Sequence, residues 1–252
     1  MRELVYLSDH KLEQFLPTLR SLWPRPKINV KAPLIDIGLE PASDADRRKL
    51  KHLARVIAHL EATARWFLDS ELDPGQWVHF EAPLNYLVVD SDGRDLVFFV
   101  DSGKATAHYP EGGTDRLLLH CSSRHLLVDR DPTRVPAPSS EGLPVKPRRG
   151  SVPDIFLHDA MGVLLRSLHA QPQPSDEGYR PPRDAVIEDD LSFAVDRLVS
   201  TIDRRVHAET AAWMAGYARI TACCTAPTPP ARYIIASPLY IEYATPPRNL
   251  RP

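Results

Sequence analysis

The sequence predicts a single α+β domain over residues 1–252, in which a mostly antiparallel sheet that includes both terminal strands carries several packed helices and long Pro-rich loops. Apolar, β-branched and aromatic residues form the run Leu4 to Leu7 at one end of the chain and the run Tyr233 to Tyr243 near the other. Because an unpaired strand edge promotes aggregation, we expect these two runs to lie side by side in one sheet. A chain of 252 residues can bury a large core without a disulfide or metal.

The first long helix is predicted from Asp44 to Ser70. Ser43 can cap its N-terminus, with Asp46 three residues further on. Apolar residues then recur every three or four positions and define one buried face, formed by Leu50, Leu53, Ile57, Leu60, Ala64 and Phe67. Polar residues off this stripe are interpreted as a solvated face, namely His52, Arg55 and His59.

Shorter apolar runs after this helix predict strands. The segments Asp73-Pro74-Gly75 and Ser91-Asp92-Gly93 have the composition of turns, so the strands are expected to form an antiparallel meander. The predicted strands run from Gln76 to Phe80, Tyr86 to Val89, Leu96 to Val100 and Arg116 to His120. Two further helical regions are predicted, from Asp154 to Ala170 and, in two pieces, from Asp184 to Ala222.

Proline clusters mark the long loops. The segment Asp131 to Pro153 contains six prolines, each of which fixes φ and removes a backbone donor. This segment is therefore predicted to be a surface connection that is either a flexible lid or disordered. Its basic residues Lys146, Arg148 and Arg149 offer a third interpretation, a docking strip.

The net charge and the cysteines indicate which classes of protein the chain does not resemble. A net charge of −2 argues against generic binding to a nucleic-acid backbone. Three cysteines form neither a disulfide framework nor a paired zinc pattern, which favours a reducing compartment. The first residues do not resemble a secretory leader, and no apolar run approaches the length of a membrane span. The expected location is the cytoplasm.

The motifs of nucleoside triphosphatases, dinucleotide enzymes and common hydrolases are absent from the sequence.

His79 and Glu81 are the first candidate site. They are two residues apart in a predicted strand, so both point to the same face of the sheet. Such a pair can act as acid and base or as metal ligands, and Trp77 on that face can serve as a stacking wall. The alternative is a solvated sheet face with a cross-strand salt bridge.

A second candidate site follows the predicted strand that ends at His120. His120, Cys121 and His125 can hold a metal, although the sequence supplies no recognisable fourth ligand and no metal is assigned. Cys121 beside a histidine can equally be a nucleophile or a small buried apolar residue. The neighbouring polar residues have the composition of an oxyanion or phosphate cradle, formed by Ser122, Ser123 and Arg124.

Polar residues also follow the first strand and interrupt the last. Ser8 or Asp9 is placed to cap a helix that contains Lys11, and Ser237-Pro238 is expected to bulge the last strand or to place it at an edge. These segments resemble an uncharacterised group of actinobacterial proteins that open on a strand with Ser-Asp and a lysine and close on a Ser-Pro-Leu-Tyr strand. The resemblance carries no activity. It implies that a set of polar residues lies in one place, namely Ser8, Asp9, Lys11, Ser123, His125, Ser237 and Tyr240.

The leading functional hypothesis is a binding or regulatory module that recognises a small molecule or a partner protein. The first alternative is an enzyme of small-molecule metabolism that works through acid–base or metal chemistry at His79, Glu81, His120 and His125. The second alternative is a structural component of a larger assembly, with the Pro-rich loops as docking surface. No cofactor and no oligomeric state is indicated by the sequence.

Overall fold

The protein is described by a computed structural model over residues 3–22, 43–90, 96–102, 115–128, 133–136, 195–196, 199–200, 202–203, 206–227 and 230–246. Two long helices lie within this part of the chain, α1 (Asp9–Leu22) and α2 (Asp44–Glu61). The strands are β1 (Leu4–Leu7), β2 (Arg65–Trp66), β3 (Trp77–Asp90), β4 (Leu96–Asp101), β5 (Arg116–Ser122), β6 (Thr133–Pro136), β7 (Ala212–Pro227) and β8 (Pro230–Tyr243).

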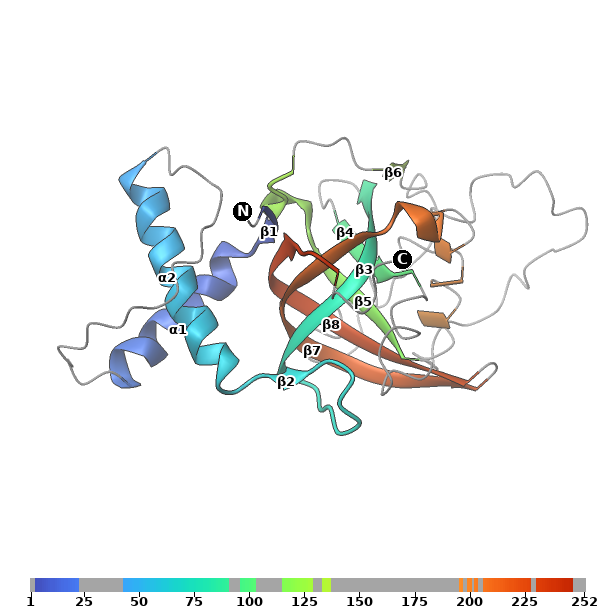
Figure 1. Cartoon of the computed structure of the whole chain (residues 1–252), viewed down its shortest axis with the longest axis horizontal. Helices are drawn as coiled ribbons and strands as arrows, with labels where there is room; N and C mark the ends of the chain where they lie inside the picture. Colours follow the sequence, from blue (N-terminus) through green and yellow to red (C-terminus); the bar gives the residue numbers. More distant parts are fainter. Residues whose placement is uncertain are drawn as a thin grey trace, which may run out of the picture.

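Five of these strands close into a barrel (Figure 1). The long strand β3 makes the closure possible, because residues 77–84 pair with β7 and residues 84–89 pair with β4. The remaining pairs are β4 with β5, β5 with β8 in parallel, and β8 with β7. Numbered along the chain, the barrel strands follow the order 1-2-3-5-4-1 with the third and fifth parallel, which is the strand topology of the oligonucleotide- and oligosaccharide-binding (OB) barrel.

Alternate residues of the barrel strands fill its interior. On β7, for example, Met214, Ala218 and Ile220 belong to the central apolar cluster, and on β3 so do Val78 and Phe80. Gly216 falls between Met214 and Ala218, where a Cβ atom would overlap the backbone oxygen of Tyr240. The interior is therefore a packed core with no room for a larger side chain at this point.

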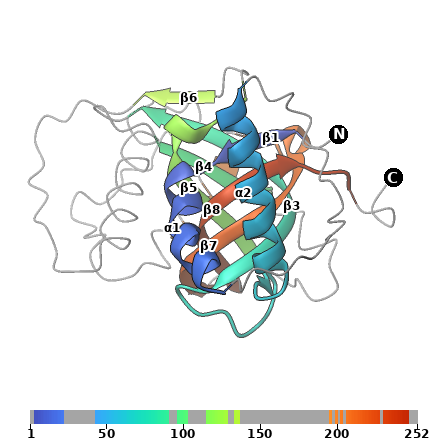
Figure 2. The ribbon, with the colours of Figure 1, turned by 90° about the vertical axis from the view of Figure 1, so that its left-hand side faces the viewer.

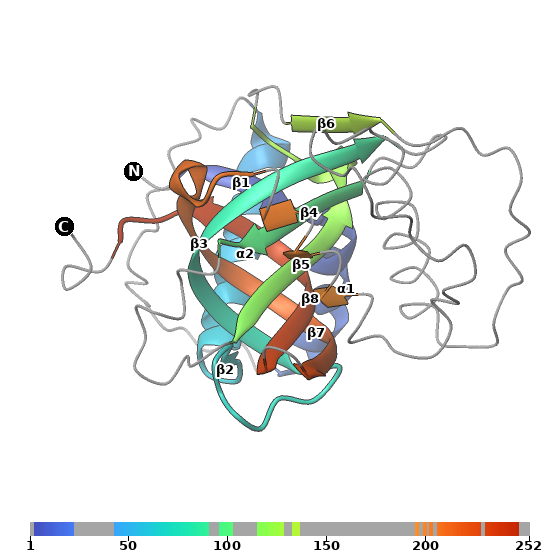
Figure 3. The same ribbon diagram turned by 90° about the vertical axis from the view of Figure 1, so that its right-hand side faces the viewer.

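Two outer faces of the barrel are covered by other parts of the chain. Helices α1 and α2 lie across one side, over Tyr217, Leu239 and Tyr240 (Figures 1 and 2). On the opposite side, Val195 and its neighbours pack against the outward residues of β4, β5 and β8 (Figure 3). This second cluster consists of Leu87, Leu96, Phe98, Val100, Leu118, Val195, Val199, Ile202, Tyr233 and Ile235.

The covering segment near Val195 is also held by polar contacts. The Tyr233 hydroxyl donates a hydrogen bond of 2.6 Å to Asp196, and the Arg116 guanidinium forms a two-pronged ion pair with Asp203 at 2.9 and 3.0 Å. Apolar burial, this hydrogen bond and this ion pair together hold the covering residues on the barrel. The outward face of β4 and β5 is therefore part of the folded core.

The predicted α+β class is wrong, because the fold is a closed, mainly β barrel with two long helices in the described part of the chain. The error lies mainly in the helix predicted from Asp184 to Ala222, since residues 212–227 form β7. An alanine-rich run favours a helix locally. Here the small residues are required because they face the barrel interior, where Gly216 and Ala218 lie close to neighbouring strands.

Other boundaries change for identifiable reasons. The helix predicted from Asp44 to Ser70 begins as expected, with Ser43 accepting a hydrogen bond from the Asp46 amide, but it ends at Glu61. Phe67 lies in the barrel core and not on the helix stripe. The two strands predicted between Gln76 and Val89 are one strand, in which Pro83 precedes the residue where β3 changes partner from β7 to β4.

The expected pairing of the terminal strands is confirmed, because β1 runs antiparallel to β8. Within the predicted Asp131 to Pro153 loop, residues 133–136 form the short strand β6 beside β3, which corrects the loop prediction for those residues. The rest of that loop and the helix predicted from Asp154 to Ala170 lie outside the described residues.

Candidate functional site

Lys11 is the centre of a polar cluster at the junction of α1 with the barrel. Ser8 accepts the Leu12 amide through its carbonyl oxygen and the Lys11 amide through its hydroxyl, and thus caps α1. One turn into the helix, Lys11 reaches β8, where its Nζ donates to Ser237 Oγ at 2.5 Å and to the Pro238 carbonyl oxygen at 2.7 Å. The sequence separation between Lys11 and Ser237 is 226 residues. The structure thus brings together Ser8, Lys11 and Ser237.

Both hydrogen-bond acceptors of the Lys11 ammonium are uncharged. No carboxylate lies within ion-pair distance of it in the described part of the chain, and Lys11 is only partly exposed. Burial therefore lowers the Lys11 pKa to about 8, with the positive charge of Arg219 acting in the same direction. Lys11 is thus a cation that can lose its proton under mildly alkaline conditions.

Tyr6 links this cluster to the second candidate site. Its hydroxyl lies near the side chains of Ser8 and Cys121, and its ring meets His125 edge to face at 5.9 Å between centroids. Burial raises the pKa of the Cys121 thiol to about 12, and the thiol also lies 3.7 Å from the Val97 carbonyl oxygen. Burial lowers the pKa of His125. Cys121 is therefore a protonated thiol at neutral pH.

His120 and Cys121 point to opposite faces of β5. Cys121 belongs to the barrel core, whereas His120 Nε2 lies 2.9 Å from Thr221 Oγ1 on the outer face. His125 is in the short 3₁₀ turn Ser123–His125, so the structure does not bring His120, Cys121 and His125 to one point. In this turn Ser122 Oγ accepts the Arg124 amide at 3.4 Å, and Arg124 is exposed.

His120 should make folding stability depend on pH. Complete burial lowers the His120 pKa from 6.5 to about 3. Between these two pH values the unfolded chain therefore binds a proton at His120 that the folded protein does not bind. The free energy of unfolding should therefore fall by roughly 1.4 kcal/mol per pH unit as the pH drops from about 6 toward 4. In urea titrations across this range, His120→Gln should lose that part of the slope. Parallel pH profiles for the two proteins would contradict the assignment.

His79 and Glu81 share one outer face of β3, as predicted. The His79 ring lies between those of Trp66 and Tyr217, at centroid distances of 5.5 and 5.2 Å. Glu81 accepts a hydrogen bond of 2.7 Å from the Trp213 indole. Trp77 packs against Phe15 of α1, with 5.3 Å between ring centroids. The two residues are placed among aromatic rings, and their proposed acid–base role stays a prediction.

Two other residues from the predicted set have different surroundings. Asp9 forms an ion pair with Lys49 of α2. Tyr240 is buried in the apolar cluster under the helices, 6.0 Å from the Tyr217 ring. The implied gathering of polar residues is thus seen for Ser8, Lys11 and Ser237, with His125 connected through Tyr6 and Asp9 facing α2.

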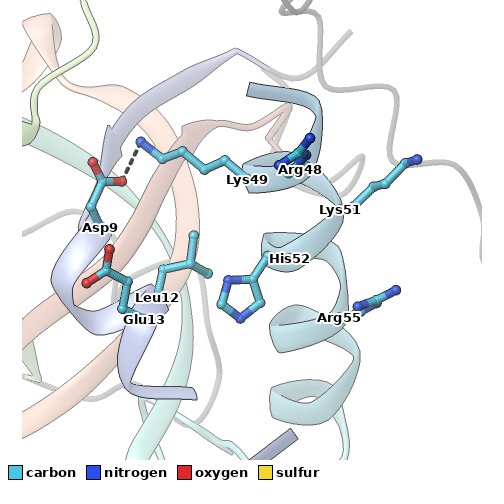
Figure 4. Close-up of a pocket in the computed structure, with 8 residues that line it drawn as sticks. All are labelled: Asp9, Leu12, Glu13, Arg48, Lys49, Lys51, His52 and Arg55. Carbon is cyan, nitrogen blue, oxygen red and sulfur yellow. Dashed lines mark ion pairs between the residues drawn. The ribbon is translucent and has the colours of Figure 1, made fainter. Parts of the chain in front are cut away.

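A groove between α1 and α2 was missed by the sequence reasoning. Its volume is about 570 Å³, and it is lined by Asp9, Leu12, Glu13, Arg48, Lys49, Lys51, His52 and Arg55. Figure 4 shows Lys49 extending from α2 to Asp9 and His52 pointing toward α1, while Lys51 and Arg55 extend from the far side of α2. The available signal was the position of His52 and Arg55 off the apolar stripe, which was interpreted as a solvated face.

His52 is an unusual lining residue in this groove. Its Nε2 atom is buried and has no hydrogen-bond partner among the described residues. Burial lowers the His52 pKa, Arg55 lowers it further and Glu13 opposes both. A buried polar atom without a partner is costly, so a hydrogen-bonding ligand at this point would relieve that cost.

Within the described part of the chain, no group of three or more His, Cys, Asp or Glu residues is arranged to hold a metal ion. Among the helices described, none is both long and apolar enough to cross a membrane.

Neither a curated protein nor a solved structure matches the chain. The sequence model of DUF7019, described as a family of unknown function, matches residues 2–245, nearly the whole length of the chain. The protein therefore belongs to the DUF7019 family.

Proposed function

We propose that this protein is a binding module that holds a small polyanion, bearing phosphate or carboxylate groups, in the groove between α1 and α2. The observation that carries the proposal is the buried His52 Nε2 atom beside a lining with four cationic and two acidic side chains. This local positive surplus contrasts with the net charge of −2 for the chain. Arginine and lysine are the side chains that proteins use most to bind phosphate and carboxylate groups.

The covered faces of the barrel support this location. In OB barrels the surface around the second and third strands commonly binds the ligand. Here these strands are β4 and β5, and their outward residues Phe98 and Leu118 are buried beneath Val195 and Val199. Their face is occupied by the chain itself, whereas the groove between α1 and α2 has free volume.

The groove offers two kinds of contact to an anion. The first is a hydrogen bond from the ring of His52, which points toward α1 (Figure 4). Lys49 adds less positive charge than the other cations, because its ammonium forms an ion pair with Asp9. Arg48, Lys51 and Arg55 are exposed and lie at the rim, where they can attract an anion over the screening length of the solvent. We expect the rim to contribute long-range attraction and His52 to contribute orientation.

Binding calorimetry with pyrophosphate and, separately, citrate tests the proposal. The wild-type protein should bind at least one of these probes, and the double substitution Lys51→Gln/Arg55→Gln should weaken that binding by a factor between about 2 and 30, with the middle of that range expected. The range follows because each charged contact at an exposed site contributes about 0.2–1 kcal/mol and 1.4 kcal/mol corresponds to a factor of ten. Raising the salt concentration should weaken binding in the wild type more than in the variant.

The matched control removes two exposed cations elsewhere, Arg65→Gln/Arg124→Gln. This variant has the same net charge as the first and leaves the groove unchanged, so it should bind the probe within a factor of about two of the wild type. Equal loss in both double variants would show a nonspecific charge effect and contradict the groove. Absence of binding of either probe to the wild type would reject a polyanion as the ligand.

We further propose a cytoplasmic location. In the described part of the chain, which includes Cys121, Cys223 and Cys224, no two cysteines form a disulfide, which suits a reducing compartment.

A further inference from the structure

Lys11 and Ser237 have the geometry of a base and a nucleophile. Their side-chain atoms Nζ and Oγ are 2.5 Å apart, and both residues remain partly exposed. Ser237 lies beside an irregularity of β8, where Ala218 pairs with Pro238 and the next pair along is Tyr217 with Tyr240. Such bulges redirect side chains and are common next to active sites.

We propose that Ser237 and Lys11 form a serine–lysine pair that transfers an acyl group from a small activated ester to water. The site is separate from the anion groove, and the inference does not depend on the polyanion proposal. Lysine serves as the general base for a serine nucleophile on several unrelated folds, where it takes the place of histidine.

The proposed reaction has two balanced halves. Ser237 Oγ attacks the ester carbonyl carbon while its proton passes to the neutral Nζ of Lys11, and the bond between the carbonyl carbon and the leaving oxygen breaks as Nζ returns that proton to the alcohol. Water then attacks the carbonyl carbon of the acylated serine and gives one proton to Nζ, and Nζ passes that proton to Ser237 Oγ as the bond from Oγ to the carbonyl carbon breaks and the acid leaves. The sum is one ester and one water converted to one acid and one alcohol.

The second hydrogen bond of Lys11 fits this cycle. A neutral amine has one lone pair and two N–H groups, so Nζ can accept the Ser237 proton while one N–H still donates to the Pro238 carbonyl oxygen. The Pro238 contact therefore fixes the direction of the amine in both protonation states. This contact keeps the lysine oriented without the carboxylate that orients the base in a Ser-His-Asp triad.

The charge environment allows the neutral form near physiological pH. The charged or titratable groups that interact electrostatically with Lys11 are His120 and Cys121 on β5, His125 in the adjoining turn and Arg219 on β7. Two of these groups are neutral at pH 8, since burial keeps His120 unprotonated and Cys121 a thiol, while Arg219 disfavours a second cation. A base at Lys11 should then become active as the pH rises through about 8.

Hydrolysis of p-nitrophenyl acetate by the purified full chain, from pH 6.5 to 9.5, tests the pair. We expect turnover above the buffer rate that rises with a midpoint near pH 8, and mass spectrometry after rapid acid quench should find an acetyl group on Ser237. Ser237→Ala and Lys11→Arg should each lower the rate about a hundredfold or more. Ser70→Ala, which changes an exposed serine outside the cluster, should retain the wild-type rate.

Lys11→Arg separates catalysis from folding. An arginine keeps the positive charge and the donors toward β8 but cannot serve as a base, so a merely structural lysine predicts a native melting temperature and a wild-type rate. The proposed base predicts a lost rate at a melting temperature close to that of the wild type. If Lys11→Arg does not fold, two other results test the pair: the residue that carries the acetyl group in the mass spectrum and the rate of Ser237→Ala. Acetylation of Lys11 alone, or a wild-type rate in Ser237→Ala, would overturn the pair.

Discussion

Gly216→Ala is expected to destabilise the protein strongly. The new Cβ would overlap the backbone oxygen of Tyr240 on β8 and come within 3.0 Å of Phe80 Cζ, inside the barrel. A backbone oxygen in a paired strand cannot move without breaking the β7–β8 ladder. Overpacking of a well-packed core typically costs 1–3 kcal/mol and more where backbone must shift, so we expect a loss of about 3 kcal/mol or greater. Urea unfolding followed by circular dichroism measures this loss.

Gly75→Ala is the comparison for that experiment. Gly75 has a φ of +92°, but its added Cβ would come no closer than 3.7 Å to the Arg219 side chain. The expected cost is only about 1–2 kcal/mol, which arises from the left-handed backbone and not from a clash. If Gly216→Ala were as stable as the wild type, or less damaging than Gly75→Ala, β7 and β8 could not be packed as the barrel requires.

Phe98→Ala should produce a loss of similar size on the outer side of the barrel. Phe98 is fully buried between β4 and the segment that contains Val195, Val199 and Ile202. Truncation of a buried phenylalanine costs about 3–5 kcal/mol, because apolar contacts are lost and a cavity remains. The same urea titration measures this cost, with Phe98→Leu as a milder variant that keeps an apolar side chain and is expected to lose less stability than Phe98→Ala.

The Phe98 experiment also tests whether the β4 and β5 face is truly covered. If the covering segment were only loosely attached, Phe98 would be close to solvent and its truncation would cost less than about 1 kcal/mol. Such a small effect would mean that a ligand can reach the outer face of β4 and β5. It would therefore weaken the assignment of binding to the groove between α1 and α2.

Local patterns in the sequence predicted single elements well and the barrel poorly. The cap at Ser43 and the strands that begin at Leu96 and Arg116 depend on short-range periodicity, which the sequence displays directly. Closure depends on β3 pairing with both β4 and β7, and residues as distant as Trp77 and Arg219 meet in that pairing. Such long-range register leaves no local signal.

The strand β7 shows how composition misled the prediction. Its alanines favour a helix, yet Met214, Gly216, Ala218 and Ile220 alternate with residues of the outer face. Period-two alternation of small and apolar residues is typical of the inner face of a narrow barrel. In residues 212–227 this alternation, and not the alanine content, indicates the local structure.

The candidate sites were predictable to different degrees. The pairing of Lys11 with Ser237 was implied only by the family resemblance, since no spacing rule connects residues 226 positions apart. The segment with the composition of an anion cradle forms a short 3₁₀ turn, in which Ser122 is the N-cap and Ser123 and Arg124 are the first residues. His52 was visible as a polar residue off the helix stripe, but its burial depends on α1 packing beside α2, which the helix pattern alone does not contain.

The side-chain NMR signals of His52 during a pyrophosphate titration test the central proposal most directly. A bound anion favours the protonated imidazole, so the pKa of His52, which burial now lowers, should rise as the groove fills. We predict that the His52 ring signals shift and saturate with the probe, while those of His59, which packs against Phe15 further along the same helix, stay unchanged. Unchanged His52 signals at probe concentrations that saturate binding in calorimetry would place the ligand elsewhere and contradict the assignment of the groove.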